Sequence, residues 1–213
     1  MFAQTTIEGN PEIRYGWYLR PSFAMCRAQA ELHDLLERQY GLIAGGAFMP
    51  HATVKGFFRS DATLPELVAA FDRAVEGHAP FCVVNRGPIA FGRSSIVLDI
   101  HHREDGSRNE ALQSIHESAR KEILPLVHPA CDFTPREGAM ERFQAHLTLI
   151  MADMPAFAFD EIVEFVGEAR PIGPERFTAE YFHLFAFHSE DWHGAWWSSL
   201  TWKLLHTWRL GAE

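Results

Sequence analysis

The chain has 213 residues, 47% of them hydrophobic, so it is long enough to bury a substantial core without staples. Its formal charge of -9, from 19 basic and 28 acidic residues, argues against a protein that coats long nucleic acid, because such binding needs many Lys and Arg contacts with phosphates. The three cysteines are scattered and form no Cys-x-x-Cys pair, which indicates neither a disulfide framework nor a thiolate zinc site.

Targeting and membrane segments are not predicted. Residues 1–10 lack a basic start followed by an apolar run, and no stretch approaches the roughly 18 uninterrupted apolar residues of a membrane span. Together with the unpaired cysteines, this favours a cytoplasmic protein that is neither secreted nor inserted in a membrane.

The elements of the first half are predicted from the spacing of apolar residues. Alternating apolar residues predict strands, and apolar residues at three- and four-residue steps predict amphipathic helices. Thr63-x-x-Glu66, with Pro65 in the first turn, is a capping box that marks a helix start. The predicted elements are a strand over 14–20, a helix over 22–40 with Gly41 as its cap, a strand over 50–58, a helix between 63 and 77, and strands over 81–84, 89–91 and 96–100.

The second half repeats these signals. Gly106-Ser107-x-x-Glu110 predicts the start of a third helix, and Pro125 predicts its end. A turn-rich segment follows, and the last two segments are long and aromatic, which is typical of a terminal hairpin. The predicted elements are turns over 128–142, a strand over 143–150, a short helix over 160–167, and hairpin strands over 176–187 and 196–210.

The order of strand, helix and aromatic strand occurs twice. From His51, a helix near Leu64 and a strand near Phe91 lie 13 and 40 residues on, and from His146 the corresponding offsets are 13 and 39. Two copies are too few for a solenoid. The repeat predicts two similar β-α-β lobes, whose like strands face each other across a groove.

Both repeats start with a strand that carries a His-x-Thr motif: His51 with Thr53, and His146 with Thr148. Because side chains alternate along a strand, each histidine shares a face with its threonine, while apolar neighbours occupy the other face. On the first strand this alternation also puts Lys55 and Phe57 on the histidine face. One face of each strand is therefore predicted to pack in the core and the other to be open for chemistry.

The chemistry that fits two facing histidines is phosphodiester cleavage. Such a reaction needs a base for the attacking oxygen and an acid for the leaving oxygen, and imidazoles near neutral pH serve both roles without a metal. Threonine hydroxyls can donate to phosphate oxygens, where negative charge builds in the transition state. Lys55 can add positive charge there, and Phe57 and Tyr18 can stack on a base.

The two motifs, His51-Ala52-Thr53-Val54 and His146-Leu147-Thr148-Leu149, resemble the His-hydrophobic-Thr/Ser-hydrophobic signature of the 2H phosphoesterase superfamily. RNA 2′,5′-ligase-like proteins and cyclic nucleotide phosphodiesterases belong to it. The segments Trp17-Tyr18-Leu19-Arg20-Pro21 and Trp208-Arg209-Leu210 are similar to the edges of that family's fold.

The resemblance implies an α+β fold over residues 1–213, a single bilobal domain whose duplicated β-α-β lobes place antiparallel sheets across a pseudo-twofold groove, with the helices outside. It also implies catalysis without metal or other cofactor. The residues it assigns are His51 and His146 as the catalytic pair, and Thr53 and Thr148 as phosphate contacts. Many members place a tyrosine or arginine just after the second motif, where this chain has Ile150 and Met151.

We therefore expect a monomer that hydrolyses a 2′,3′-cyclic or 2′,5′ phosphodiester of a small nucleotide or RNA end, without binding long duplexes. The same acid and base serve the reverse ligation. Two alternatives stay open: a module that binds nucleotide or RNA ends without turnover, and a metal-dependent hydrolase that uses His183, His188 and His193. The spacing of five alternates faces along a strand and disfavours the second alternative.

Overall fold

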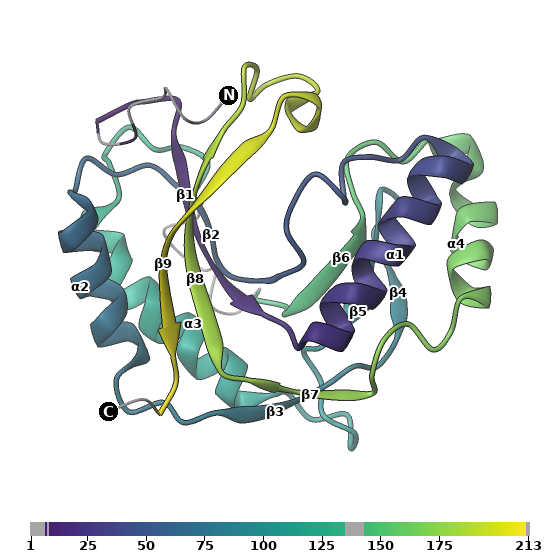
Figure 1. The fold of residues 1–213 in the computed structure, drawn as a ribbon, viewed down its shortest axis with the longest axis horizontal. Coiled ribbons are helices and arrows are strands. Elements are labelled where there is room, and N and C mark those ends of the chain that lie inside the picture. The colour runs from purple at the N-terminus through teal and green to yellow at the C-terminus, as the bar shows by residue number, and fades with distance from the viewer. Residues whose placement is uncertain (1–6, 8, 135–142, 212–213) are drawn as a thin grey trace.

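A computed structural model describes residue 7 and residues 9–134 and 143–211, so part of the predicted turn segment 128–142 lies outside the described residues. Within the described ranges the chain forms nine strands and four α-helices (Figure 1). The strands are β1 (Arg14–Arg20), β2 (Ala52–Phe58), β3 (Phe81–Val84), β4 (Pro88–Phe91), β5 (Ser95–Asp99), β6 (His146–Ile150), β7 (Arg176–Ala179), β8 (Tyr181–His188) and β9 (Thr201–Arg209). The helices are α1 (Phe23–Tyr40), α2 (Leu64–Val75), α3 (Glu110–Ile123) and α4 (Phe159–Glu168).

Seven strands form one antiparallel sheet in the order β4-β5-β6-β2-β1-β8-β9, and β3 pairs with β7 separately. The predicted α+β class is confirmed. The two motif strands β2 and β6 lie side by side at the centre and join the halves, so the halves share one sheet instead of forming two separate ones. If β2 and β6 were edge strands of two separate sheets, their outer backbone N–H and C=O groups would have no strand partner, and pairing with each other supplies one.

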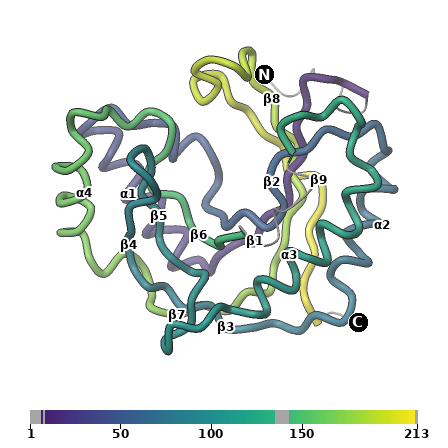
Figure 2. The backbone as a smooth tube through the Cα atoms, turned by 180° about the vertical axis from the view of Figure 1, so that it is seen from behind, coloured from purple at the N-terminus to yellow at the C-terminus, as the bar shows by residue number. Residues whose placement is uncertain are grey.

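The helices lie outside the sheet, as predicted. Figures 1 and 2 show α2 and α3 beside the half made of β1, β2, β8 and β9, and α1 and α4 beside the half made of β4, β5 and β6. α2 and α4 begin at Leu64 and Phe159, 13 residues after each motif histidine, and the strands that follow them, β3 and β7, pair with each other. The pseudo-twofold relation between the halves stays a prediction.

Local signals explain most of the boundaries. The Ser22 hydroxyl accepts the Met25 amide at the start of α1, and Gly41 ends that helix in the left-handed conformation at φ 72°. Thr63 and Glu66 form the predicted capping box of α2. The prediction that Ser107 starts α3 is wrong, because Asn109 is the N-cap and Ser107 bonds to Asp105 in the preceding turn.

The predicted strand over 176–187 is also wrong in one respect. It divides at Glu180 into β7 and β8, which belong to different sheets. The segment is aromatic and β-prone on both sides of the break, so periodicity carries no signal for it. β8 and β9 form the predicted terminal hairpin.

The larger core lies between the sheet and the helices. Trp17 is fully buried, with its ring stacked at 4.8 Å on both Phe71 and Phe182, so it ties β1 to α2 and β8. A smaller cluster, Tyr18, Phe48, Phe185 and Phe187, packs on the other face of the sheet. No helix within the described residues is long and apolar enough to cross a bilayer.

Candidate active site

The centre of the sheet brings the two His-x-Thr motifs together. Ala52 pairs with Leu147 in antiparallel register. Extending this register by one residue each way puts Thr148 opposite His51 and Thr53 opposite His146. Positive charge on His146 is among the causes that lower the pKa of His51, after burial. Each histidine therefore lies across from the threonine of the other motif.

Both imidazoles are held in the same way. Nδ1 of His51 lies 2.7 Å from the carbonyl oxygen of Met49, and Nδ1 of His146 lies 2.7 Å from that of Gln144, in each case two residues earlier. Since a carbonyl oxygen can only accept, Nδ1 is the donor, and in the neutral ring Nε2 is the unprotonated nitrogen. In each neutral ring the nitrogen left without a proton is thus Nε2.

The surroundings of His51 are apolar. Its side chain is 9% exposed, with the ring of Tyr18 edge-on at 4.6 Å and that of Phe48 at 5.5 Å. Burial is the main cause that lowers the pKa of His51 to about 4, the Met49 carbonyl opposes the shift, and charge on His146 adds to it. His51 is therefore neutral at pH 7.

The surroundings of His146 are more polar. The side chain is half-buried, the ring of Phe91 lies 5.2 Å away, and Asp99 is the cross-strand partner in β5. Burial lowers the pKa of His146, while the Gln144 carbonyl and the Asp99 carboxylate both raise it. His146 is the histidine of the pair with an acidic neighbour that favours its protonated form.

Two side chains of α1 hold the second motif from behind. Nε2 of Gln29 and Nε2 of His33 lie 2.8 and 3.1 Å from the carbonyl oxygen of Thr148. Both residues are buried, and they stand four residues apart on one face of the helix. Neither residue is among the predicted site residues, although two polar residues on the apolar face of a predicted helix are a signal that could have found them.

The residues predicted to contact substrate differ in how far they are buried. Thr53 and Thr148 are half-buried. Tyr18 lies against His51 but is only 4% exposed, so its ring packs beneath the imidazole, and a β-carbon on Gly16 would collide with its hydroxyl. Phe57 is half-buried and packs on Phe187, on the same side of the sheet as Tyr18.

Lys55 does not share the histidine face, and the prediction from alternation is wrong. In the pairing of β1 with β2, Tyr18 aligns with Thr53 but Trp17 aligns with Lys55, so β2 contains an extra residue, as in a β-bulge. Lys55 is 4% exposed, and its Nζ lies 5.1 Å from the Phe58 ring centroid. Burial lowers the pKa of Lys55 to about 8.

The C-terminal histidines do not form a cluster of their own. His183 aligns with Tyr18 on the neighbouring strand, His188 ends β8, and His193 is exposed in the loop that follows. In the described ranges, no three His, Cys, Asp or Glu side chains converge to hold a metal ion.

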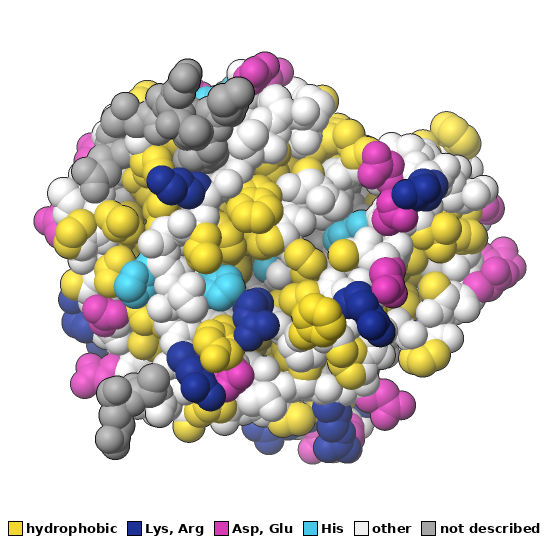
Figure 3. All heavy atoms as spheres, in the orientation of Figure 1, with side chains coloured by type: hydrophobic (Ala, Val, Ile, Leu, Met, Phe, Trp, Pro, Cys, Tyr) yellow, Lys and Arg dark blue, Asp and Glu magenta, His cyan; other side chains and the backbone are white. Residues whose placement is uncertain are grey.

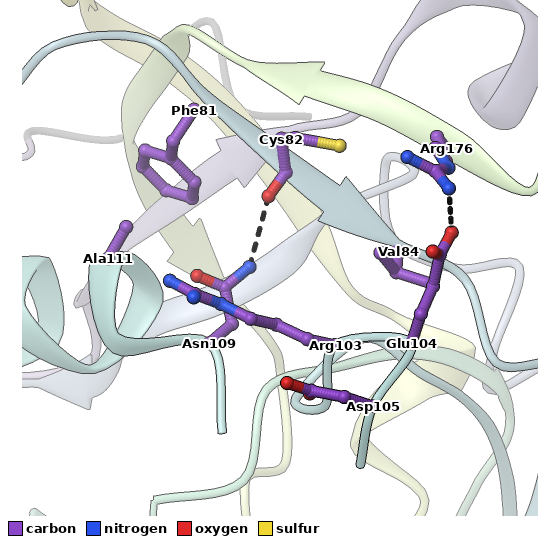
Figure 4. A pocket seen from close by; sticks show the side chains of 9 residues that line it. All are labelled: Phe81, Cys82, Val84, Arg103, Glu104, Asp105, Asn109, Ala111 and Arg176. Atoms are coloured by element: carbon purple, nitrogen blue, oxygen red, sulfur yellow. Dashed lines mark hydrogen bonds and ion pairs between the residues drawn. The ribbon is translucent and has the colours of Figure 1, made fainter. Parts of the chain in front are cut away.

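A cavity of about 400 Å³ elsewhere on the surface contains none of the predicted site residues (Figure 4). It lies between β3, β7 and the start of α3. Arg176 is paired with Glu104 across it, and the Asn109 amide donates to the Cys82 carbonyl oxygen. These two contacts join four of its nine lining residues in pairs. Figure 3 shows histidine side chains at several separate places on the face of the molecule seen in Figure 1.

Known structures share this fold. The crystal structure of TT0787 of Thermus thermophilus gives a TM-score of 0.62 at 18% identity, covering 94% of this chain and 99% of that one. Crystal structures of E. coli LigT complexed with 3′-AMP and with NADP+ give TM-scores of 0.54 and 0.53 at 13% and 14% identity. These cover 93% and 94% of this chain and 98% and 99% of LigT.

The sequence comparison identifies the family. No curated protein sequence matches significantly. The model of the 2'-5' RNA ligase superfamily matches residues 25–191, a range that includes both His-x-Thr motifs. This match confirms the resemblance to 2H phosphoesterases seen in the motifs. The chain belongs to the 2'-5' RNA ligase superfamily.

Proposed function

We propose that this protein is a metal-independent phosphoesterase that acts on a 2′,3′-cyclic or 2′,5′ phosphodiester of a nucleotide or RNA end, with His51 and His146 as its acid and base. The observation that carries the proposal is the central pairing of β2 and β6, with both imidazoles oriented by equal 2.7 Å bonds to carbonyl oxygens. Two oriented proton-transfer groups beside one site are what in-line displacement at phosphorus requires.

His51 is the base in this mechanism. Its neutral Nε2 takes a proton from the attacking water, and the water oxygen bonds to phosphorus. Protonated His146 gives its Nε2 proton to the ribose oxygen as the bond from that oxygen to phosphorus breaks. The low pKa of His51 and the Asp99 carboxylate beside His146 support this division of roles.

Thr53 and Thr148 stabilise the phosphate in this mechanism. By the extended register, each hydroxyl lies across from the histidine of the other motif. A hydroxyl there can donate to a non-bridging oxygen, whose negative charge grows in the transition state. The side chains of Gln29 and His33 bond to the main-chain carbonyl oxygen of Thr148, which supports a fixed position for the Thr148 hydroxyl.

The same two groups can serve ligation, with a ribose hydroxyl in the place of water. One histidine takes the proton of that hydroxyl as its oxygen bonds to the phosphorus of a cyclic phosphate, and the other gives a proton to the ring oxygen whose bond to phosphorus breaks. LigT has been crystallised with 3′-AMP and with NADP+, which supports a nucleotide as the ligand of this fold.

The proposal is tested by turnover of the four nucleoside 2′,3′-cyclic phosphates and a 2′,5′-linked dinucleotide in the presence of a chelator. The wild-type protein should cleave at least one of them. His51→Ala and His146→Ala should each lower kcat/KM about 10³-fold or more, because each removes a proton-transfer group. His193→Ala is the matched control and should retain turnover. Wild-type activity in both active-site variants would overturn the assignment.

The competing proposal is a binding module without turnover. The observation that favours it is the second motif's flank, where Ile150 is buried and Met151 carries no charge, in place of the tyrosine or arginine common in the family. It predicts that wild-type protein binds nucleoside monophosphates but leaves every substrate of the panel intact.

A further inference from the structure

Three side chains form a row across β1, β8 and β9. Arg20 aligns with Tyr181, and Tyr181 aligns with Arg209, as direct cross-strand partners. The Arg20 Cζ lies 4.5 Å from the Tyr181 ring centroid, and the Arg209 Cζ lies 5.6 Å from it. Cross-strand partners share a face of the sheet. The row is thus two guanidiniums held on one aromatic ring by cation–π contacts.

This row lies on the same face as the candidate active site. The pairing of β1 with β8 has no register shift, so Arg20 shares the face of Tyr18, two residues before it. Tyr18 packs against His51. Its partner on β8 is His183, whose pKa is lowered by burial and by the positive charge of Arg20. Two residues of strand span about 7 Å. The Arg-Tyr-Arg row therefore stands one pleat repeat from the ring that supports His51.

The charge of the row is not explained by ion pairing alone. Among the described residues, no carboxylate lies within ion-pair distance of Arg20, whose guanidinium donates to the Pro21 carbonyl oxygen at 3.3 Å. Arg209 lies 3.4 Å from the Glu180 carboxylate, in a pair that is 59% and 31% exposed. Figure 3 shows basic side chains over the ends of β1, β8 and β9, on a chain whose formal charge is -9.

We propose that the Arg20–Tyr181–Arg209 row binds a second phosphate of the substrate, one nucleotide away from the phosphodiester at His51 and His146. The inference rests on the proposed function and specifies its substrate as an RNA end longer than one nucleotide. A guanidinium can donate two parallel N–H bonds to a phosphate, and the shared contact with Tyr181 orders both guanidiniums before binding. Many family members have a tyrosine or arginine just after the second motif, where this chain has Ile150 and the uncharged Met151. The row supplies positive charge from β1 and β9 instead.

The test compares three substrates with the same reacting group. They are adenosine 2′,3′-cyclic phosphate, the dinucleotide ApA with a terminal 2′,3′-cyclic phosphate, and that dinucleotide with a neutral methylphosphonate at the internal linkage. Wild-type kcat/KM should be about tenfold higher for the charged dinucleotide than for the mononucleotide. The methylphosphonate should lose this preference, because it keeps both bases and removes only the charge.

Variants locate the preference in the protein. In the double variant Arg20→Gln/Arg209→Gln, the ratio of dinucleotide to mononucleotide kcat/KM should fall to about one. Arg73→Gln is the matched control, since Arg73 is an exposed arginine paired with Glu122 on the helical side, and it should keep the wild-type ratio. A wild-type ratio near one, or an unchanged ratio in the double variant, would overturn the inference.

A binding measurement separates this inference from the proposed function. If the wild-type protein cleaves neither these three substrates nor any member of the panel that tests the proposed function, the proposed function fails. Fluorescence anisotropy of labelled ApA ending in a 3′-phosphate then still tests the row. The double variant should then bind about tenfold more weakly and lose about one or two units of the slope of log Kd against log salt. Equal affinity and slope in both proteins would overturn the inference independently.

Discussion

The two motif histidines make the same hydrogen bond to the backbone but have different neighbours. Both rings donate from Nδ1 to the carbonyl two residues earlier. His51 then packs among Tyr18 and Phe48, whereas His146 lies beside the Asp99 carboxylate. A duplicated motif thus supplies two identical groups, and the packing around them makes their proton affinities unequal. In the proposed mechanism, this inequality divides the pair into an acid and a base.

Variants of the two threonines test whether both motifs contact the phosphate in the same way. Thr53→Val and Thr148→Val keep the side-chain shape and remove the hydroxyl, so each should lower kcat of the cyclic nucleotide reaction about 100-fold, the cost of one lost transition-state donor. The comparison with Ser118→Ala, a hydroxyl on α3 that bonds to His78, controls for loss of a polar group elsewhere. If only one threonine mattered, the two motifs would not contact the phosphate equivalently.

Asp99→Asn tests where the two motifs differ. In the free enzyme, kcat/KM should rise with pH through the His51 pKa at about 4 and fall through the His146 pKa, which burial holds below its ordinary 6.5. Removing the carboxylate lowers the His146 pKa further, so the descending limb should move to lower pH. At pH 7 the rate should fall about threefold.

The pH profile of this variant also identifies the acid. The ascending limb should stay in place, because Asp99 does not contribute to the His51 pKa. Movement of the ascending limb instead would show that His146 is the base, and would reverse the assigned roles. Thermal unfolding of the variant checks that the turn held by Asp99, which bonds to the His101 amide and to His102, is intact.

Lys55→Met tests the opposite face of β2. Because Lys55 is buried away from the histidines, the variant should retain kcat/KM. The lowered Lys55 pKa means that the folded state disfavours the ammonium, so the cost is full below a pH of about 8 and vanishes above the unfolded pKa near 10.5. Removing the charge should raise the unfolding free energy by about 2 kcal/mol at pH 7.

Denaturant unfolding at pH 7 and at pH 10 measures this effect. The gain from Lys55→Met should shrink at the higher pH, and Lys203→Met, at an exposed position of β9, should change stability little at either pH. A large loss of activity in Lys55→Met with unchanged stability would place this lysine back in the active site.

The sequence predicts the elements, and it singles out the two histidines that the structure brings together, because both depend on local signals. Caps at Ser22, Gly41 and Thr63 set helix ends, and the repeated His-x-Thr marks β2 and β6. The threonine positions follow from strand alternation as long as the strand is regular. Alternation fails at Lys55 because a bulge is a property of the pairing with β1, which periodicity in β2 alone does not carry.

Tertiary contacts account for the remaining misses. The sequence predicts that Tyr18 meets substrate, but the aromatic cluster beside it covers the ring, and no pattern within β1 encodes that cluster. The supports Gln29 and His33 reach Thr148 across 119 and 115 residues of sequence. Such contacts depend on which half of the sheet α1 covers, and this is decided by the fold as a whole.

The most direct test of the central claim is an NMR titration of the two imidazoles with a nucleoside 3′-monophosphate. Histidine is labelled with ¹⁵N, and His51→Ala and His146→Ala assign the two sets of ring signals. If both rings face one phosphate, the Nε2 signals of His51 and His146 should shift together and give one Kd. A shift in only one ring, or two rings that respond with different Kd values, would contradict a shared site.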